Sequence, residues 1–367
     1  MTTVQSFKKT LQKEIKDSLF NNYPDNWDYT LFGPEQGPLT FRSKVVTWLK
    51  HNLPQQMIYQ QLFRMRLEPH LEGMSRLSDL LEDDCSKELL IQLLAYRLMG
   101  HKKVKLPLSN KTYWQQLAKA ESLVKDKTDY IDSGFRDMKL YKHDLNEIGY
   151  PVQMYLMSFG ILVDFIIKQY EFNRNGVVIK AEQNDIVIDA GACWGDTALY
   201  FAHEVGEHGK VYSFEFIPGN ITFFNKNISL NPALHQRIEL VENPLGEKPG
   251  IEMYYNDFGP ASTVSFTEFK KATGKTKTET IDNLVKAKGL QKVDFIKMDI
   301  EGAEMSSLKG ARETLIAFKP KLAIAVYHSL DDFYNIAEYL DSLALGYKFY
   351  LAHYTIHAGE TILYAKI

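Results

Sequence analysis

Apolar residues recur at three- and four-residue spacing over the first 140 residues, with polar residues between them, and this pattern predicts amphipathic helices. The first such stripe is flanked by lysines and consists of Val4, Phe7, Leu11, Ile15 and Leu19. The predicted helices cover residues 4–19, 43–51, 55–67 and 85–99. The last one ends at Gly100, with basic residues after it, which is typical of a helix C-terminus. Residues 21–40 are rich in Pro, Gly and Asn and predict a loop.

The pattern changes near residue 176, where short apolar runs begin to alternate with helical stretches. The predicted strands are 186–190, 210–214, 238–242, 295–299, 322–327, 347–352 and 361–365. The predicted helices between them are 196–205, 219–230, 280–288, 303–318 and 329–343. This alternation predicts parallel βαβ units and a doubly wound sheet. Only the turn 357–360 separates the last two strands, so we expect the last strand to be antiparallel.

We therefore predict an α/β chain with a Rossmann-like, mostly parallel sheet, preceded by a mainly helical N-terminal region. The predicted domains are residues 1–140 and 141–367, the second with its core at 176–367. The helical region could cover a ligand pocket as a lid, bind a substrate that accepts a transferred group, or form a homodimer.

The longest apolar stretch, residues 150–167, is interrupted by Pro151, Gln153 and Asp164. We interpret it as a buried helix or pocket wall rather than a membrane span. Four aromatic residues of the wider segment 141–172 could face a sugar or an adenine ring, but a plain core is the favoured interpretation. These residues are Tyr150, Tyr155, Phe159 and Tyr170.

Composition narrows the setting of the protein. The net charge is -3, with 43 basic and 46 acidic residues. The chain therefore lacks the excess of basic residues that would indicate a nucleic acid or an anionic membrane as partner. Cys85 and Cys193 are the two cysteines, too few for a disulfide framework or a structural zinc site. The N-terminus is charged throughout and does not resemble a secretory signal. We expect a cytoplasmic protein without stable membrane insertion.

The pattern of residues 185–202 predicts a buried strand, a glycine turn and the start of a helix. In such a unit, the ligand lies beyond the carboxyl end of the strand. Gly191 and Gly195 let the backbone approach that ligand closely. Glu215 ends the next strand about twenty residues later, where an acid can accept both hydroxyls of an adenosine ribose. These features suit either NAD or S-adenosylmethionine (SAM).

Two positions of the turn favour SAM. A dinucleotide fingerprint beginning at Gly191 would need glycine at Cys193 and glycine or alanine at Asp196. The charge of Asp196 at the helix start would also repel a pyrophosphate. SAM has no phosphate, and its ammonium and sulfonium groups tolerate Asp189 and Asp196. In the alternative, the glycines only shape a tight turn and Asp196 only caps the helix. Cys193 is interpreted as a small residue filling the turn rather than a nucleophile, because no histidine lies near it in sequence.

A second motif lies at residues 293–311, where Lys297, Asp299 and Glu301 follow one another at alternate positions. On an extended strand, alternate side chains share a face, so Asp299 and Glu301 are expected near the methyl donor. Two close carboxylates raise one pKa, which suits a general base, and they could equally hold a divalent metal. Alternatively, Asp299 to Glu304 only favour the start of the next helix.

Histidines follow in the last part of the chain. His328 comes at the end of the next strand, and histidine is well suited to take a proton near neutral pH. His353, Thr355 and His357 alternate in residues 351–361, where they would contact substrate or lie on the surface.

Taken together, these motifs resemble the FkbM family of SAM-dependent methyltransferases. The resemblance rests on VIDAGACWGDTALYFA, on VYSFEFIPGN at 211–220, on TIDNL at 280–284, and on VDFIKMDIEGAE followed by LKGA. It covers residues 180–330 well. It implies methyl transfer to a hydroxyl, commonly on a sugar, polyketide or other secondary metabolite. The acceptor is accordingly expected to be a small molecule or a glycan.

By position, Asp189, Gly191 and Gly195 match the family's glycine-rich turn, Glu215 matches its ribose acid, and Asp299 with Glu301 matches its Asp-x-Glu-Gly element. The predicted cofactor set is Asp189, Ala190, Gly191, Gly195, Asp196, Thr197, Glu215, Phe216 and Asn243. Ala192, Cys193 and Trp194 stand where the family often has an Asn-containing stretch, which could alter the pocket near the sulfonium.

We nominate His328 first and Asp299 second as the base, with Glu301 as an orienting group. A divalent metal held by the same three residues is possible but not expected, and its identity is left open. Two other functions remain open: an NAD(P)-dependent oxidoreductase on the same fold, and a SAM-binding module without catalysis.

Overall fold

The computed structural model describes residues 2–33, 55–135, 138–259 and 262–367. The chain forms two compact units, and neither is continuous in sequence. Unit 1 comprises 1–113, 326–342 and 348–363, and unit 2 comprises 114–325, 343–347 and 364–367. The predicted domain boundary near residue 140 stays a prediction.

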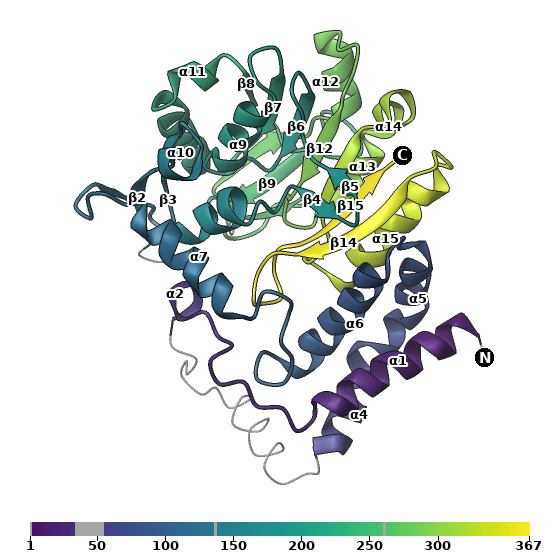
Figure 1. The fold of residues 1–367 in the computed structure, drawn as a ribbon. Helices are drawn as coiled ribbons and strands as arrows, with labels where there is room; N and C mark the ends of the chain where they lie inside the picture. Colours follow the sequence, from purple (N-terminus) through teal and green to yellow (C-terminus); the bar gives the residue numbers. More distant parts are fainter. Residues whose placement is uncertain (1, 34–54, 136–137, 260–261) are drawn as a thin grey trace. The chain divides into compact units, whose positions relative to one another are not determined.

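Unit 1 is mainly helical within its described residues (Figure 1). Its elements are α1 (Thr3–Ser18), α2 (Tyr29–Phe32), α4 (Gln55–Arg66), η1 (Glu68–His70), α5 (Leu71–Leu80), α6 (Asp84–Met99), α15 (Leu330–Ser342) and β14 (Lys348–His353). The predicted helices 4–19, 55–67 and 85–99 are confirmed, whereas 43–51 lies outside the described residues. Asp83 caps α6 by accepting from the Ser86 backbone, and Gly100 ends it with a φ of 84°.

The central sheet has seven strands in the order β14-β15-β13-β12-β6-β7-β8. The strands not yet introduced are β6 (Ile186–Ala190), β7 (Lys210–Phe214), β8 (Ile238–Val241), β12 (Phe295–Met298), β13 (Lys321–Ala325) and β15 (Thr361–Lys366). The five strands from β13 to β8 pair in parallel, as predicted. The loop between β14 and β15 is too short for a parallel crossover, so the two strands form an antiparallel hairpin.

Helices cover both faces of this parallel sheet (Figure 1). They are α9 (Asp196–Glu204), α10 (Pro218–Ser229), α11 (Pro232–His235), α12 (Ile281–Lys288), α13 (Glu304–Lys309) and α14 (Arg312–Phe318). The crossovers through α9 and α10 run along the sheet in one direction, and those reaching β12 and β13 return in the other. Right-handed connections therefore place α9 and α10 on one face and α12 to α14 on the opposite face.

The predicted helix 303–318 is two helices, because the chain bends at Gly310. A Cβ at Gly310 would lie 2.1 Å from the Gly246 carbonyl oxygen, so only glycine allows this approach. The TIDNL segment supports the same corner. Thr280 caps α12, and the Asp282 carboxylate accepts from the backbone of Glu313 and Thr314 at the start of α14.

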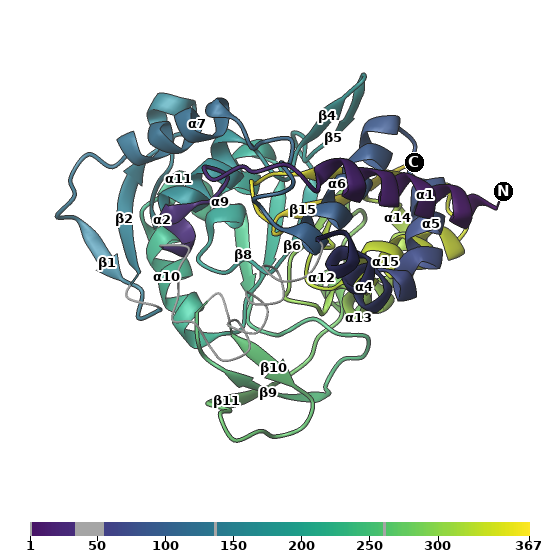
Figure 2. The ribbon, with the colours of Figure 1, turned by 90° about the horizontal axis from the view of Figure 1, so that it is seen from below.

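Several short elements were not predicted. They are α7 (Lys111–Ser122), β1 (Tyr130–Asp132), β2 (Lys139–Asp144), η2 (Asn146–Ile148), β3 (Gln153–Leu156), β4 (Phe172–Arg174), β5 (Val177–Ile179), β9 (Glu252–Asn256), β10 (Thr263–Ser265) and β11 (Gly274–Lys277). Figure 2 shows the β10-β9-β11 sheet below the strands of the main sheet. Because these strands have three to six residues and mixed polarity, their pattern is too short to distinguish from loop.

The apolar stretch 150–167 packs as β3, α8 (Ser158–Gly160) and the π-helical turn η3 (Ile161–Ile166). Tyr150 and Tyr170 are 3% and 2% exposed, which favours the core interpretation of these aromatic rings. No helix among the described residues is long and apolar enough to span a membrane.

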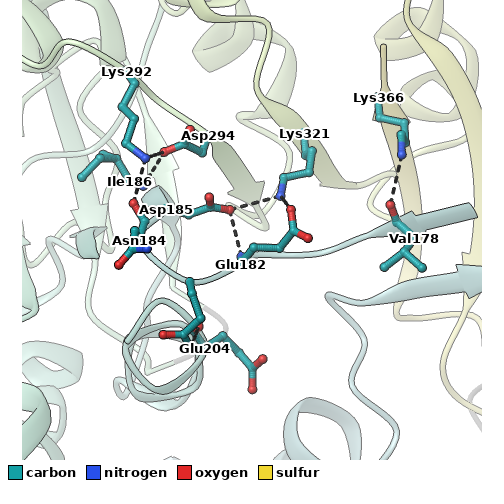
Figure 3. A network of polar contacts seen from close by, with 11 residues as sticks. Val178, Glu182, Asn184, Asp185, Ile186, Glu204, Lys292, Asp294, Lys321 and Lys366 are labelled. Atoms are coloured by element: carbon teal, nitrogen blue, oxygen red, sulfur yellow. Dashed lines mark hydrogen bonds and ion pairs between the residues drawn. The ribbon is translucent and has the colours of Figure 1, made fainter. Parts of the chain in front are cut away.

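An ion pair and hydrogen bonds join the amino-terminal ends of β6, β12 and β13 (Figure 3). The Asp185 carboxylate accepts from the Glu182 backbone and from Lys321 Nζ, at 2.8 and 3.1 Å. The Asp294 carboxylate accepts from the Ile186 backbone at 2.7 Å and pairs with Lys292. This edge is opposite to the one where α/β sheets bind ligands, so its groups provide matched controls for variants of the site.

Candidate active site

The strand order reverses between β6 and β12, since the chain winds outward through β7 and β8 on one side and through β13 on the other. In doubly wound sheets, ligands bind at the carboxyl ends of the strands beside such a reversal. Three of the predicted residues of unit 2 directly follow these strands. Gly191 follows β6, Glu215 follows β7, and Asp299 follows β12.

Gly191 lies at the closest approach of two backbone segments. Its φ is +86°, and a Cβ there would lie 1.9 Å from the Asp299 carbonyl oxygen. On the other side, the backbone N–H groups of Gly191 and Ala192 donate to the Phe214 carbonyl at 3.1 and 3.0 Å. The turn is thus held between β12 and β7, and a side chain at Gly191 would separate them.

Gly195 has a φ of +87° and stands at the N-cap of α9. The side chain of Trp194 beside it is 2% exposed and donates from Nε1 to Asn220 Oδ1 at 3.0 Å. Trp194 therefore joins the turn to α10. Burial raises the pKa of the Cys193 thiol well above its ordinary value, which favours the neutral, space-filling role over a nucleophile.

A row of polar side chains crosses three strands beneath the turn. Register pairs Asp189 with Lys297 of β12 on one side and with Ser213 of β7 on the other. Lys297 Nζ lies 3.1 Å from Asp189 Oδ1, and Ser213 Oγ donates to Asp189 Oδ2 at 3.0 Å. Thr197 Oγ1 of α9 lies 3.0 Å from both carboxylate oxygens. The Asp189 carboxylate, which is 0% exposed, is therefore engaged by the protein itself.

Lys297 connects this row to the turn, since its Nζ also donates to the carbonyls of Ala190 and Gly191 at 3.1 and 2.6 Å. Burial opposes its charge, but Asp189 and Asp299 outweigh burial and raise the pKa of Lys297. Lys297 was not in the predicted site. Its sequence signal is a charge inside the apolar run of a buried strand, because such a charge needs a buried partner.

Glu215, at 7% exposure, uses both carboxylate oxygens within the protein. Its Oε1 accepts from the backbone of Phe216 and Ile217 at 2.7 and 2.8 Å, before α10 begins. Its Oε2 accepts from Asn220 Nδ2 at 3.1 Å and keeps lone-pair capacity for a further donor. The Phe216 ring lies 5.8 Å from that of Tyr255. Asn243 donates to the Lys277 carbonyl at 3.1 Å.

A second group of acids meets the start of α9 from η3. The Asp164 side chain is 4% exposed and hydrogen-bonds that of Asp196, the first residue of α9. Gln169 Nε2 donates to Asp164 Oδ1 at 3.1 Å. Neither Asp164 nor Gln169 was in the predicted site. The signal for Asp164 is again a charge within an apolar run.

The second motif departs from the predicted alternation. β12 ends at Met298, and Glu301 lies exposed in a turn with a φ of +55°. Alternation along an extended strand therefore stops before Asp299 and does not place Glu301 on its face. Tyr170 donates to Asp299 Oδ2 at 3.3 Å. Glu304 is fully buried and accepts from the Ile300 backbone at 2.8 Å, as the helix-start alternative expects.

Comparison with known proteins agrees with this geometry. Residues 189–349 match the Methyltransferase FkbM domain. This part of the chain is similar to FkbM methyltransferase domains. Methyltransferase sdnD of Sordaria araneosa is 25% identical over 184 residues, which cover 42% of this chain and 70% of that protein. The crystal structure of Methyltransferase FkbM from Methylobacillus flagellatus KT aligns with a TM-score of 0.50 and 17% identity, over 88% of this chain and 77% of that chain, and so shares its fold.

The FkbM domain match supports the predicted SAM-dependent methyltransferase. The polar side chains near the start of α9 are compatible with SAM as the ligand. The buried amide oxygen Oε1 of Gln169 has no hydrogen-bond partner among the described residues. The same side chain donates to Asp164, and Asp164 in turn hydrogen-bonds Asp196 at the start of α9. Acceptors and carboxyl groups at a helix start suit a cationic ligand and would repel a pyrophosphate.

The remaining predicted residues lie in unit 1. His328 belongs to this unit, whereas Asp299 and Glu301 belong to unit 2, so their joint action stays a prediction. His353 and Thr355 are 6% and 0% exposed, so the surface interpretation is wrong for them. His353 bonds Thr361 and Thr355 at 2.8 and 3.3 Å. Burial lowers the pKa of His353 to about 3, which keeps it neutral near pH 7.

Proposed function

We propose that this protein is an O-methyltransferase that transfers a methyl group from SAM to a hydroxyl of a small molecule or glycan. The observation that carries the proposal is the acidic start of α9, within the part of the chain that matches the FkbM domain. Asp196, which is hydrogen-bonded to Asp164, lies where a dinucleotide-binding enzyme would hold the pyrophosphate. The NAD(P)-dependent oxidoreductase is therefore the less favoured alternative.

In this proposal, SAM supplies an electrophilic methyl group on a sulfonium. Glu215 would accept from the ribose hydroxyls through Oε2, since its Oε1 already holds the chain before α10. The backbone of Gly191 and Gly195 would approach the cofactor closely, because neither residue has a side chain there. Asp189 and Thr197 would lie beneath the glycine turn, where they hold Lys297 and the start of α9 in position. Ala190, Phe216 and Asn243 complete the proposed cofactor set.

The test of the cofactor is calorimetric titration of the purified protein with SAM, S-adenosylhomocysteine and NAD. We expect micromolar binding of SAM and of its demethylated product, and no binding of NAD. Binding of NAD alone would reverse the assignment and indicate redox chemistry. Absence of binding by all three compounds would contradict the proposal.

For the acceptor, we propose His328 as the base that removes the hydroxyl proton, with Asp299 as second candidate and Glu301 orienting one of them. His328→Ala is expected to lower turnover about a hundredfold, because general-base catalysis contributes that much. SAM affinity should stay within about twofold, since the base acts on the acceptor. Turnover is measured as methyl transfer to hydroxylated acceptors.

The matched control is His208→Ala, at an exposed position, which should leave turnover unchanged. If His328→Ala also keeps turnover within a few-fold of the original, His328 is not the base, and Asp299→Asn becomes the next variant to measure.

A further inference from the structure

The two acids at the start of α9 contact each other, and this contact constrains their protonation. A hydrogen bond between two carboxyl groups requires a proton on one of them, because an ionised carboxylate only accepts. Asp164 and Asp196 make such a contact. The pair is built from two elements, the π-helical turn η3 and the first turn of α9. π-Helical turns are frequent at functional sites.

We propose that Asp164 and Asp196 form a proton-sharing carboxyl pair that binds a cationic group of SAM and releases its proton to solvent as the cofactor enters. The inference rests on the proposed function and deepens it. Before binding, the pair holds one proton and one negative charge. After binding, it has lost the proton and carries two negative charges, and the cofactor's positive charge lies beside them.

Other acceptors at the turn are already in use. The carbonyls of Ala190 and Gly191, which could otherwise accept from an ammonium, accept from Lys297 Nζ. The Asp189 carboxylate is engaged by Lys297, Thr197 and Ser213. The pair and Gln169 Oε1, which has no partner within the described part of the chain, offer acceptors beside α9.

The surrounding charges are compatible with a proton on the pair. Burial raises the pKa of Asp196, while its bond to Asp164 and the charge of Lys297 act in the opposite direction, and Asp189 adds to the increase. Cys193 interacts electrostatically with both Asp196 and Glu215. Burial raises the pKa of the Cys193 thiol and of the Glu215 carboxyl group, which favours the neutral form of each.

The test is calorimetry of SAM binding at about pH 6.5, below the ordinary pKa of an α-amino group, in buffers of different ionisation enthalpy. The dependence of the measured enthalpy on the buffer gives the protons released. We expect close to one proton per SAM for the unchanged protein. SAM affinity should rise with pH, because the deprotonated pair is the form that holds the cation.

Asp164→Asn should abolish the release, since the remaining Asp196 carboxylate accepts from the amide and stays ionised. SAM affinity should fall about tenfold with the loss of one charge-assisted contact. Asp196→Asn tests the same pair from α9 and keeps the proposal testable if one variant does not fold. Asp185→Asn is the matched control, because that buried acid lies at the opposite ends of the strands and should keep the release (Figure 3).

The outcomes separate the two proposals. Proton release with both SAM and S-adenosylhomocysteine assigns the pair to the ammonium, and release with SAM alone assigns it to the sulfonium. Binding of SAM without release, or release that persists in both Asn variants, overturns the pair and leaves the proposed function standing. If neither compound binds the unchanged protein, the proposed function fails, and this inference fails with it.

Discussion

Lys297→Met is expected to lower the free energy of unfolding by about 3–5 kcal/mol, the usual cost of removing one partner of a buried ion pair. Lys297 and Asp189 are 1% and 0% exposed, so water cannot replace the lost cation. The substitution also removes the Lys297 donor from the Gly191 carbonyl, whereas the Ala190 carbonyl still accepts from the Asp299 backbone N–H. Urea unfolding followed by far-ultraviolet circular dichroism measures the change.

Two controls make this prediction specific. Lys292→Met removes a lysine just before β12 that pairs with Asp294, but at 49% exposure this pair should contribute less than about 1 kcal/mol (Figure 3). Adding Asp189→Asn to Lys297→Met should recover part of the loss, because no unpaired charge remains buried. If Lys297→Met were as mild as Lys292→Met, the row beneath the turn would not be a stabilising feature.

Gly191→Ala should be the most disruptive single methyl addition in the proposed cofactor turn. The new Cβ would lie 1.9 Å from the Asp299 carbonyl oxygen, and backbone on both sides prevents relief by a side-chain rotation. We expect a loss on the order of 4 kcal/mol in unfolding free energy, and a SAM affinity reduced by at least about tenfold in any protein that folds. Urea unfolding and calorimetric titration with SAM measure the two effects.

Gly289→Ala is the matched control for the left-handed backbone. Gly289 has a φ of +61° and nothing within 4 Å of the position of a Cβ, so only the conformational cost of about 1–2 kcal/mol applies. SAM binding should not change. Equal losses in the two variants would show that backbone conformation, rather than the approach of β12, explains the need for glycine at position 191.

The elements predicted well are those whose pattern is long or fully buried. β6, β7 and β12 are covered on both faces, so their sequences are nearly continuous apolar runs with glycine or polar residues after them. The helix 303–318 was predicted as one piece, because a periodic pattern does not register a bend that depends on the approach of a distant glycine.

Contacts between distant segments explain what could not be predicted at the site. The sequence identifies Asp189 and Glu215 as acids at strand ends, but not which of their oxygens the protein itself uses. Thr197 and Ser213 engage the first acid, and the backbone before α10 engages the second. Such contacts depend on lateral register and on the entry angle of a helix, which local patterns do not encode.

By itself, the sequence determined the order of the βαβ units, the glycine turn after the first central strand and the position of the acids, because local polarity and backbone freedom control these features. Only the tertiary structure brought Lys297 beside Asp189 and Asp164 beside Asp196. β6 pairs with β12 across the reversal of the strand order, and η3 packs against α9. Both contacts join segments whose neighbourhood is decided by the packing of the whole sheet and its helices.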